Sequence, residues 1–303
     1  MLRILFLITI IEYYYAFQFK TFNFGVKLPT VRPNDYSLTP ILLSTLNYNN
    51  NNRLYMLSNN DLCATIQVSN LQKSKEFYSK SFGMIIKKTD ESSGDEVILG
   101  YENHPSSTLK LVAKNDNEAI LLGDGYQGIG LNVEDADEIF KKAENSGGSV
   151  VTPLADYAYG ASLIPEEDDL KQNPVRYGRL ADPDGYVIEV SEPDVLEAIK
   201  NPSAGDSRIK KFVLNVINLD ETVEYYTGLN IGFHELRRRS NVNSIPKDAS
   251  MVSFISTSDS EKDTYIELVY EYATEKINVG SGFVKLEIGL GAKNQDPNGY
   301  FIE

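Results

Sequence analysis

Alternation and helical periodicity divide the chain beyond residue 60 into repeating units of several strands and one helix. Residues 64–69 alternate between apolar and polar side chains, as a strand with one buried face does. The period then changes to that of a helix, which Ser69 or Asn70 can cap and Gly83 can end. The residues predicted on the buried face of this helix are Leu71, Phe77, Tyr78 and Phe82.

Two more strand-like runs, at 97–101 and 108–112, complete this first unit as β-α-β-β, and another short strand is expected. A second unit is predicted from a strand at 129–133 and a helix that stops at Gly147-Gly148. Its remaining strands are expected near 149–151, 161–164 and 186–190.

The third unit repeats the first at an offset of 148 residues, so that Leu219 corresponds to Leu71. A strand at 212–217 and a helix at 219–229 are therefore predicted, and a strand at 264–269 closes the unit. Repetition at a fixed offset is typical of a duplicated module.

A fourth unit begins at 284–288 but is too short. The second unit spans 61 positions from Gly128 to Glu189, whereas the stretch from Lys285 to Glu303 spans only 18. A helix and two strands do not fit into a stretch that is 43 residues shorter. We therefore expect either a degenerate unit or a sequence that lacks an internal segment.

An octapeptide occurs twice, as Asp182-Pro-Asp-Gly-Tyr-Val-Ile-Glu189 and as Asp296-Pro-Asn-Gly-Tyr-Phe-Ile-Glu303. Asp-Pro followed by Asp-Gly or Asn-Gly predicts a tight turn, and the alternating residues after it predict a strand. Each copy therefore starts a strand that ends in a carboxylate.

The first 60 residues have the features of a targeting leader. In residues 1–16, Arg3 precedes an apolar run that Glu12 interrupts, which is typical of a secretory signal peptide and too short for a membrane span. Residues 17–60 are poor in acidic side chains and sustain no apolar period, so we expect a disordered, transit-like leader. Together they are similar to two-part leaders that reach a plastid-type (apicoplast-like) organelle through the secretory route; the alternative is a secreted or membrane-associated protein.

Charge and the scarcity of reactive residues restrict the classes of function. Residues 1–60 contain five basic and two acidic side chains and so carry a net charge of +3. Because the whole chain carries −14, the remainder carries −14 − 3 = −17. Such an acidic body repels phosphate, which argues against nucleic acids and anionic membranes as partners. Cys63 is the single cysteine, so no intrachain disulfide can form, and His104 and His234 alone cannot build a histidine cluster.

Four β-α-β-β-β-like units in two pairs, with the repeated octapeptide, resemble the vicinal oxygen chelate superfamily, in particular the two-domain glyoxalase I (lactoylglutathione lyase) type. The segments that carry the resemblance are Val68 to Leu71, Phe77-Tyr78, Phe82 to Met84, Gly147-Gly148 and both octapeptides. The resemblance implies an α+β fold of paired βαβββ modules. Its domains would be 61–192 and a truncated 208–303, joined by a linker at 193–207 that includes a short helical stretch.

The resemblance also implies two sites between units. Members of the family isomerise the hemithioacetal of methylglyoxal and glutathione, their cosubstrate, with an octahedral Zn²⁺ or Ni²⁺ ion and a metal-bound glutamate as base. Carried over by position, the first site comprises Cys63, Lys110, Lys285 and Glu303. The second site comprises Lys211, Glu267, Gly128 and Glu189. Glu189 and Glu303 are the candidate bases in this assignment, and Cys63, Lys110, Lys211, Glu267 and Lys285 are candidate binding residues.

This chain departs from the family at most of these eight positions. None holds His or Gln, the family's other ligands, and a lysine ammonium repels a dication. We therefore expect no metal cofactor, and we expect Lys211 to pair with the two glutamates of its site. The family's arginine that helps to hold glutathione is also missing, because Gln67 and Asn215 stand at its two positions.

Three hypotheses about function follow. The first is a glyoxalase I-like protein without the family's metal, whose isomerase activity on glutathione hemithioacetals is altered or lost. The alternative is a non-enzymatic module that binds a small anionic ligand or a protein partner in the cleft between modules, where the lysines would face the ligand. The third is that a second chain completes the truncated domain, which would make the protein an oligomer.

Other candidate residues have simpler interpretations. Cys63 is interpreted as a small buried side chain rather than a reactive thiol, and His104 and His234 as solvated. The glycines of 123–128 have the spacing of a dinucleotide-binding loop, but they lead into a strand instead of a helix and are interpreted as an ordinary loop. The basic triplet 237–239 is interpreted as a solvated turn.

The leader interpretation can be tested by fusing residues 1–60 to a fluorescent reporter. We expect the fusion to enter the secretory route and to reach a plastid-type organelle where the cell has one. Imaging of the fused reporter, with the unfused reporter as control, measures this. A purely cytosolic signal would contradict both the organelle and the secreted interpretation.

Overall fold

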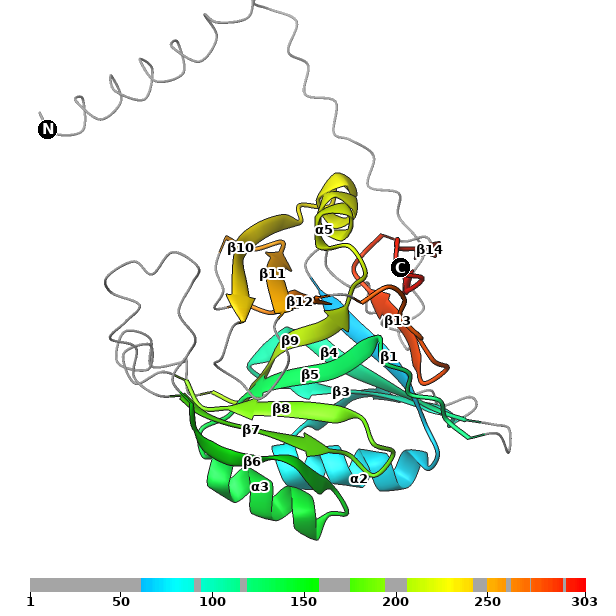
Figure 1. Ribbon diagram of the computed structural model, residues 1–303. Helices are drawn as coiled ribbons and strands as arrows, with labels where there is room; N and C mark the ends of the chain where they lie inside the picture. Colours follow the sequence, from blue (N-terminus) through cyan, green and yellow to red (C-terminus); the bar gives the residue numbers. More distant parts are fainter. Residues whose placement is uncertain are drawn as a thin grey trace, which may run out of the picture. The chain divides into compact units, whose positions relative to one another are not determined.

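The computed structural model describes residues 61–303 except 90–93, 115–118, 158–174, 194–205, 242–249, 260–262, 273 and 291–292. The chain divides into two units, Met1–Leu54 and Tyr55–Glu303, and all described residues belong to the second (Figure 1). The predicted signal and leader, the strand at 161–164 and the helical part of the linker therefore lie outside the described residues. Within the described ranges, no helix is long and apolar enough to cross a membrane.

The described elements form the predicted series of modules. The first module contains β1 (Leu62–Val68), α2 (Leu71–Phe82), β2 (Ile85–Thr89), β3 (Glu96–Tyr101) and β4 (His104–Ala113). The second contains β5 (Tyr126–Asn132), α3 (Ala136–Asn145), β6 (Ser149–Tyr157), β7 (Val175–Ala181) and β8 (Val187–Ser191). The third contains β9 (Arg208–Asn215), α5 (Leu219–Gly228), β10 (His234–Asn241), β11 (Ser250–Ser256) and β12 (Tyr265–Glu271). The described part of the fourth holds only β13 (Phe283–Glu287), β14 (Asn294–Gln295) and β15 (Phe301–Ile302).

Local sequence signals explain the helix ends. The Asn70 side chain accepts a hydrogen bond from the Lys73 backbone N–H at 2.9 Å, so Asn70 rather than Ser69 caps α2. Asn218 caps α5 in the same way, which confirms that the third unit repeats the first. Gly83 ends α2 in the left-handed conformation with φ 69°, as predicted.

Two local predictions were wrong. Strand β7 was not expected, because its sequence places Tyr177 and Arg179 on one face and a glycine on the other, which disguises the apolar alternation. The triplet at 237–239 lies in strand β10 rather than in a turn. Strand β10 lies at the edge of its sheet, where charged side chains are common. Arg237 and Arg239 each lie over the Phe254 ring, at 4.9 Å and 5.0 Å from its centroid.

The sheets join modules that are distant in sequence. A seven-stranded sheet has the order β14-β15-β13-β1-β4-β3-β2 and combines the fourth module with the first. An eight-stranded sheet has the order β10-β11-β12-β9-β5-β8-β7-β6 and combines the third module with the second (Figure 1). The central pairs, β1 with β13 and β9 with β5, are antiparallel. This is the predicted α+β fold of paired modules.

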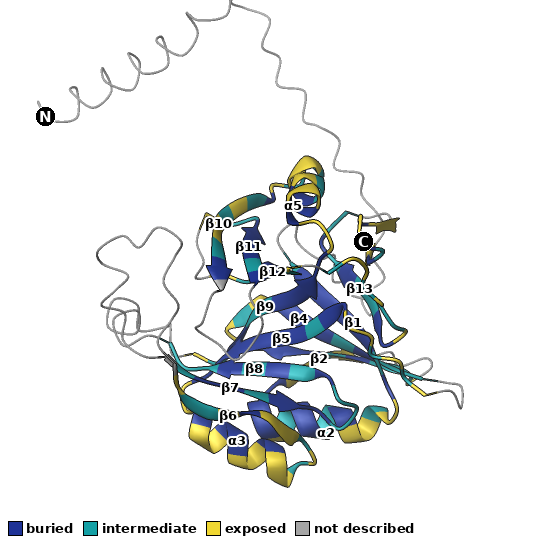
Figure 2. Ribbon diagram, in the orientation of Figure 1, coloured by how far each residue is buried: buried dark blue, intermediate teal, exposed yellow. Residues whose placement is uncertain are grey.

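Alternation along the strands separates the core from the candidate site. On β9, Phe212 and Leu214 are fully buried in the main hydrophobic core, which helices α2, α3 and α5 also join (Figure 2). Lys211, Val213 and Asn215 therefore point to the opposite side of the sheet, which we call the site face. A smaller apolar cluster, which includes Val213 and Phe254, lies on that face.

The first octapeptide holds the second module against the first. Buried Asp182 accepts hydrogen bonds from the backbone N–H groups of Asp184 and Tyr186, each at 2.9 Å, and from the Tyr78 hydroxyl of α2 at 3.0 Å. The Tyr186 hydroxyl then donates to the backbone carbonyl of Gln67 on β1 at 2.8 Å. The turn is therefore bonded to both the helix and the first strand of its neighbouring module.

The second octapeptide holds the fourth module against the third in the same way. Asp296 accepts from the Tyr226 hydroxyl of α5 at 3.2 Å, and the Tyr300 hydroxyl donates to the Asn215 carbonyl at 2.7 Å. Asn298 adds two contacts, to the Ile217 N–H and to Thr222. Because the sheets join modules one with four and two with three, the two octapeptides close the four modules into a ring.

Burial of Asp182 has a consequence for the pH dependence of stability. Burial is the main cause that raises the pKa of Asp182 to about 6. A carboxyl whose pKa is raised on folding stabilises the protein below its unfolded pKa and loses that contribution as pH rises through the folded value. From pH 5 to pH 7, we expect the wild type to lose about 1 kcal/mol of unfolding free energy relative to Asp182→Asn. Urea denaturation at both pH values measures the difference.

Thr222→Val is the matched control, because it removes a buried hydroxyl from the second octapeptide's contacts without removing an ionisable group. It should lower stability equally at pH 5 and pH 7. An equal effect of Asp182→Asn at both pH values would contradict the assignment.

Candidate functional site

The second predicted site is assembled around the ammonium group of Lys211 on the site face of the eight-stranded sheet. Lys211 Nζ lies 2.7 Å from a carboxylate oxygen of Glu267 on β12 and 2.7 Å from one of Glu189 on β8. All three side chains are largely buried, with exposed fractions of 13% for Lys211, 8% for Glu267 and 16% for Glu189. The structure thus brings together three of the four residues that the sequence assigned to this site, as a charge-paired group.

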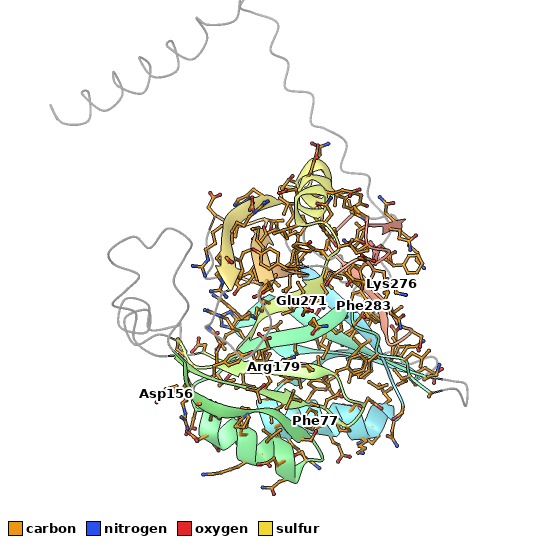
Figure 3. All side chains as sticks on the ribbon, in the orientation of Figure 1. Phe77, Asp156, Arg179, Glu271, Lys276 and Phe283 are labelled. Atoms are coloured by element: carbon orange, nitrogen blue, oxygen red, sulfur yellow. The ribbon has the colours of Figure 1, made fainter. Side chains whose placement is uncertain are left out.

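Two further side chains belong to this site and were missed because β7 was not predicted. The guanidinium of Arg179 lies 4.0 Å from Glu189 and is only 11% exposed (Figure 3). Tyr177 is buried beside the same charges, and burial raises the pKa of its hydroxyl well above the ordinary value. One arginine, one lysine and two glutamates make the centre of the site electrically neutral.

Gly128, the fourth assigned position, cannot carry any side chain. Its φ is +117°, and a Cβ atom there would lie 1.8 Å from the Val187 carbonyl oxygen. The residue opposite Lys211 across the strand pair is Gly130 instead, where a Cβ would lie 2.5 Å from the Lys211 side chain. The lysine stem therefore occupies the space that a side chain from β5 would need.

The first predicted site shows a similar arrangement with greater exposure. Lys285 on β13 contacts Glu303 and lies 2.9 Å from Glu287. Lys110 does not join them, because its ammonium group binds Glu96 on the neighbouring strand β3 at 2.7 Å. Sequence reasoning missed both Glu287 and Glu96, which alternation would have placed on the same face as Lys285 and Lys110, respectively.

Ion pairing sets the protonation of the more exposed pair. Partial burial of Lys285 opposes its charge, but the hydrogen bonds to Glu303 and Glu287 outweigh it and raise the pKa of Lys285. The hydrogen bond from Lys285 in turn holds the pKa of Glu303 below its usual value. Both groups therefore stay charged at neutral pH.

Cys63 is a buried thiol, as the sequence suggested, but it lies on the face of β1 opposite Ala64 and Ile66, which belong to the main core. It is 2% exposed, and burial raises its pKa to about 12. A thiol with so high a pKa has almost no thiolate at neutral pH, so it is neither a good nucleophile nor a good metal ligand.

The histidines lie away from both sites. His104 begins β4 with a side chain only 24% exposed, so the solvated interpretation was wrong for it, and burial lowers its pKa. His234 begins β10 with a side chain 38% exposed, and Asp259 lies 3.2 Å from its ring nitrogen.

These residues do not fit the octahedral metal ion that the resemblance implies. At the Lys211 site, an ammonium group already lies within hydrogen-bonding distance of both carboxylates, and β5 offers no side chain. At the Lys285 site, the donors would be a thiol that resists ionisation and a carboxylate bound to lysine. Across the described residues, no three His, Cys, Asp or Glu side chains are grouped so that they could hold a metal ion.

The architecture is one of paired modules with a site between the two modules of each pair. Comparisons with known proteins give the family. The model of the Glyoxalase/Bleomycin resistance protein/Dioxygenase superfamily matches residues 62–190. Lactoylglutathione lyase of Neisseria meningitidis is 31% identical over 128 residues, which cover 41% of this chain and 83% of the bacterial protein. The chain therefore belongs to the glyoxalase superfamily and is a glyoxalase I-like protein.

Longer alignments extend the relationship to two-domain proteins. Lactoylglutathione lyase of Oryza sativa subsp. japonica is 22% identical over 232 residues, which cover 75% of this chain and 71% of the rice protein. The crystal structure of glyoxalase I from Zea mays superposes with a TM-score of 0.59 at 16% identity, covering 80% of this chain and 90% of the maize chain. At that identity the maize structure shows a shared fold.

The Lys211 pairing makes a prediction about stability. Lys211→Met removes the cation that both buried carboxylates share, while Arg179 stays 4.0 Å from Glu189, so we expect a loss of about 3–5 kcal/mol of unfolding free energy at pH 7. Urea denaturation at pH 7 measures the loss. The loss should shrink at pH 5, because protonation removes the repulsion.

Lys285→Met is the matched control, since its partners Glu303 and Glu287 are 41% and 20% exposed, more than the partners of Lys211, and water can solvate them. We expect that variant to lose at most about 1 kcal/mol. Equal losses for the two variants would contradict the view that Lys211 balances buried charge.

Proposed function

We propose that this chain is a glyoxalase I-like protein in which a lysine ammonium replaces the metal ion, so that metal-dependent lactoylglutathione lyase activity is altered or lost. The observation that carries the proposal is the position of Lys211 Nζ, 2.7 Å from both Glu189 and Glu267. An ammonium can balance two carboxylates, but it has no vacant orbital with which to polarise a substrate carbonyl.

The state of the two candidate bases supports this proposal. A general base works best when its pKa lies near the working pH. Glu303 departs from this condition, because the hydrogen bond from Lys285 lowers its pKa further. Glu189 shares Lys211 with Glu267 and has Arg179 at 4.0 Å, so its negative charge is already engaged by two cations.

The second candidate function is a non-enzymatic binding module. It is favoured by the internal pairing of charges at both sites, since each lysine balances neighbouring carboxylates without a metal ion. The lysines suggested an anionic ligand at first. Each of Lys211 and Lys285 has two carboxylate partners, however, so they offer less positive charge than their number implies.

The proposal predicts the outcome of a lyase assay. The purified protein should convert the hemithioacetal of methylglyoxal and glutathione no faster than the uncatalysed reaction, with or without added Zn²⁺ or Ni²⁺. The change in absorbance as the thioester forms measures the rate. A lactoylglutathione lyase such as the Neisseria protein, assayed in parallel, controls for the substrate and metals.

Metal titration of Lys211→Gln provides a second readout. Removing the ammonium frees two carboxylates, so this variant should bind Ni²⁺ more tightly than the wild type in calorimetry. Robust metal-dependent turnover by the wild type would overturn the proposal.

A further inference from the structure

Arg179 is the member of the Lys211 site whose role the pairing of charges leaves unexplained. It lies on β7, directly opposite Glu189 of β8 in the strand pair (Figure 3). Its neighbour Leu180 is fully buried in the main core, so alternation along β7 turns Arg179 to the site face. Sequence reasoning gave this residue no function.

The two cations of the site do not contact Glu189 in the same way. Lys211 Nζ lies 2.7 Å from Oε2 of Glu189 and 2.7 Å from Oε2 of Glu267, which is hydrogen-bonding distance. Arg179 Nε lies 4.0 Å from the other oxygen of Glu189, Oε1, which is too far for a hydrogen bond. Lys211 therefore holds both carboxylates, and Arg179 only lies beside them.

The guanidinium group of Arg179 keeps its hydrogen-bond donors available. In the part of the chain that the structure describes, none of its nitrogens donates a hydrogen bond. Nε is fully buried and Nη1 and Nη2 are not, so the exposed 11% of the side chain includes both terminal nitrogens. Their N–H groups form a planar fork that matches the two oxygens of a carboxylate.

The strands on either side of β7 hold this fork in place. Strand β7 lies between β6 and β8, and Arg179 pairs in register with Thr152 on one side and Glu189 on the other. Tyr177, two positions earlier on the same face, is only 7% exposed and flanks the arginine. Donors that are already fixed in position lower the entropy cost of binding a ligand.

The charges of the site favour a monoanion over a dianion. Arg179 and Lys211 only balance Glu189 and Glu267, so the group has no surplus positive charge. A phosphate dianion at the fork would meet the Glu189 carboxylate with twice the repulsion that a monocarboxylate meets. A carboxylate is also planar, as the fork is, and gains charge-assisted hydrogen bonds from both terminal nitrogens.

We propose that Arg179 anchors a binding site for a small aliphatic monocarboxylate, whose two oxygens accept hydrogen bonds from Nη1 and Nη2. Lys211 stays paired with Glu189 and Glu267 when the ligand binds. The inference deepens the second candidate function by naming a ligand class and its anchor. It rests on the proposed function in taking an ammonium group, rather than a metal ion, as the partner of both glutamates.

Calorimetric titration of the full chain with butyrate, butanamide and inorganic phosphate tests the proposal. EDTA in the buffer ensures that no metal ion bridges ligand and protein. Butyrate should bind saturably, whereas butanamide, which lacks the charge, and phosphate should bind at least about tenfold more weakly. Raising NaCl from about 50 to 500 mM should weaken butyrate binding several-fold.

Substitutions separate charge from hydrogen-bond geometry. Arg179→Lys keeps the charge but loses the fork, so it should weaken butyrate binding about tenfold, and Arg179→Met should abolish binding. Glu189→Gln should tighten butyrate binding several-fold, because it removes the negative charge beside the fork. Arg176→Met is the matched control and should bind as the wild type does, since Arg176 lies on the opposite face of β7 and pairs with Asp137 and Asp156.

Urea denaturation shows whether each variant is folded, and Arg179→Lys decides the matter where Arg179→Met does not fold. No saturable butyrate binding, butanamide or phosphate binding as tight as butyrate, unchanged affinity in Arg179→Lys, or weaker binding in Glu189→Gln would overturn the inference. So would an equal loss of affinity in Arg176→Met. The lyase assay is independent, because metal-dependent turnover would overturn the proposed function and leave the butyrate result obtained with EDTA standing.

Discussion

The buried aspartate of each octapeptide is the constraint on which the rest of the structure depends. Asp182 and Asp296 each organise their own turn through two backbone N–H groups and bind the tyrosine of a neighbouring helix. Unpaired, such a buried carboxylate would be strongly destabilising, so its partners must stay in place. That requirement fixes helix α2 to the second module and α5 to the fourth, and it sets where the strands that carry the sites can lie.

The pairing of modules in the sheets explains why each site takes its residues from two modules. Strand β9 pairs with β5, and β1 pairs with β13, so Lys211 meets Glu189 from another module and Cys63 lies opposite Glu287. Once the octapeptides and sheets close the ring, the side chains on the site faces have little freedom. Charge must then be balanced locally, and in both sites a lysine supplies the balance.

Much of the fold and part of the Lys211 site could be predicted from the sequence. The elements that were missed have physical causes. The end of helix α2 at Gly83 was predicted correctly and its start to within one residue, because an asparagine cap and a left-handed glycine are local signals. Strand β7 was missed because Arg179 serves a buried ion pair, which no alternation pattern reveals. The Lys211 group was predicted through the family resemblance, whereas the conformation of Gly128 arises only from tertiary packing.

Lys211 also changes what the fold needs from its surroundings. A metal ion that joins two modules leaves and returns, so the stability of such a protein varies with the free concentration of the metal. Here the positive charge between Glu189 and Glu267 is part of the chain and cannot dissociate. If this ammonium replaces the metal as we propose, the junction of the second and third modules does not depend on metal supply, and starvation for metal or its sequestration would leave it intact.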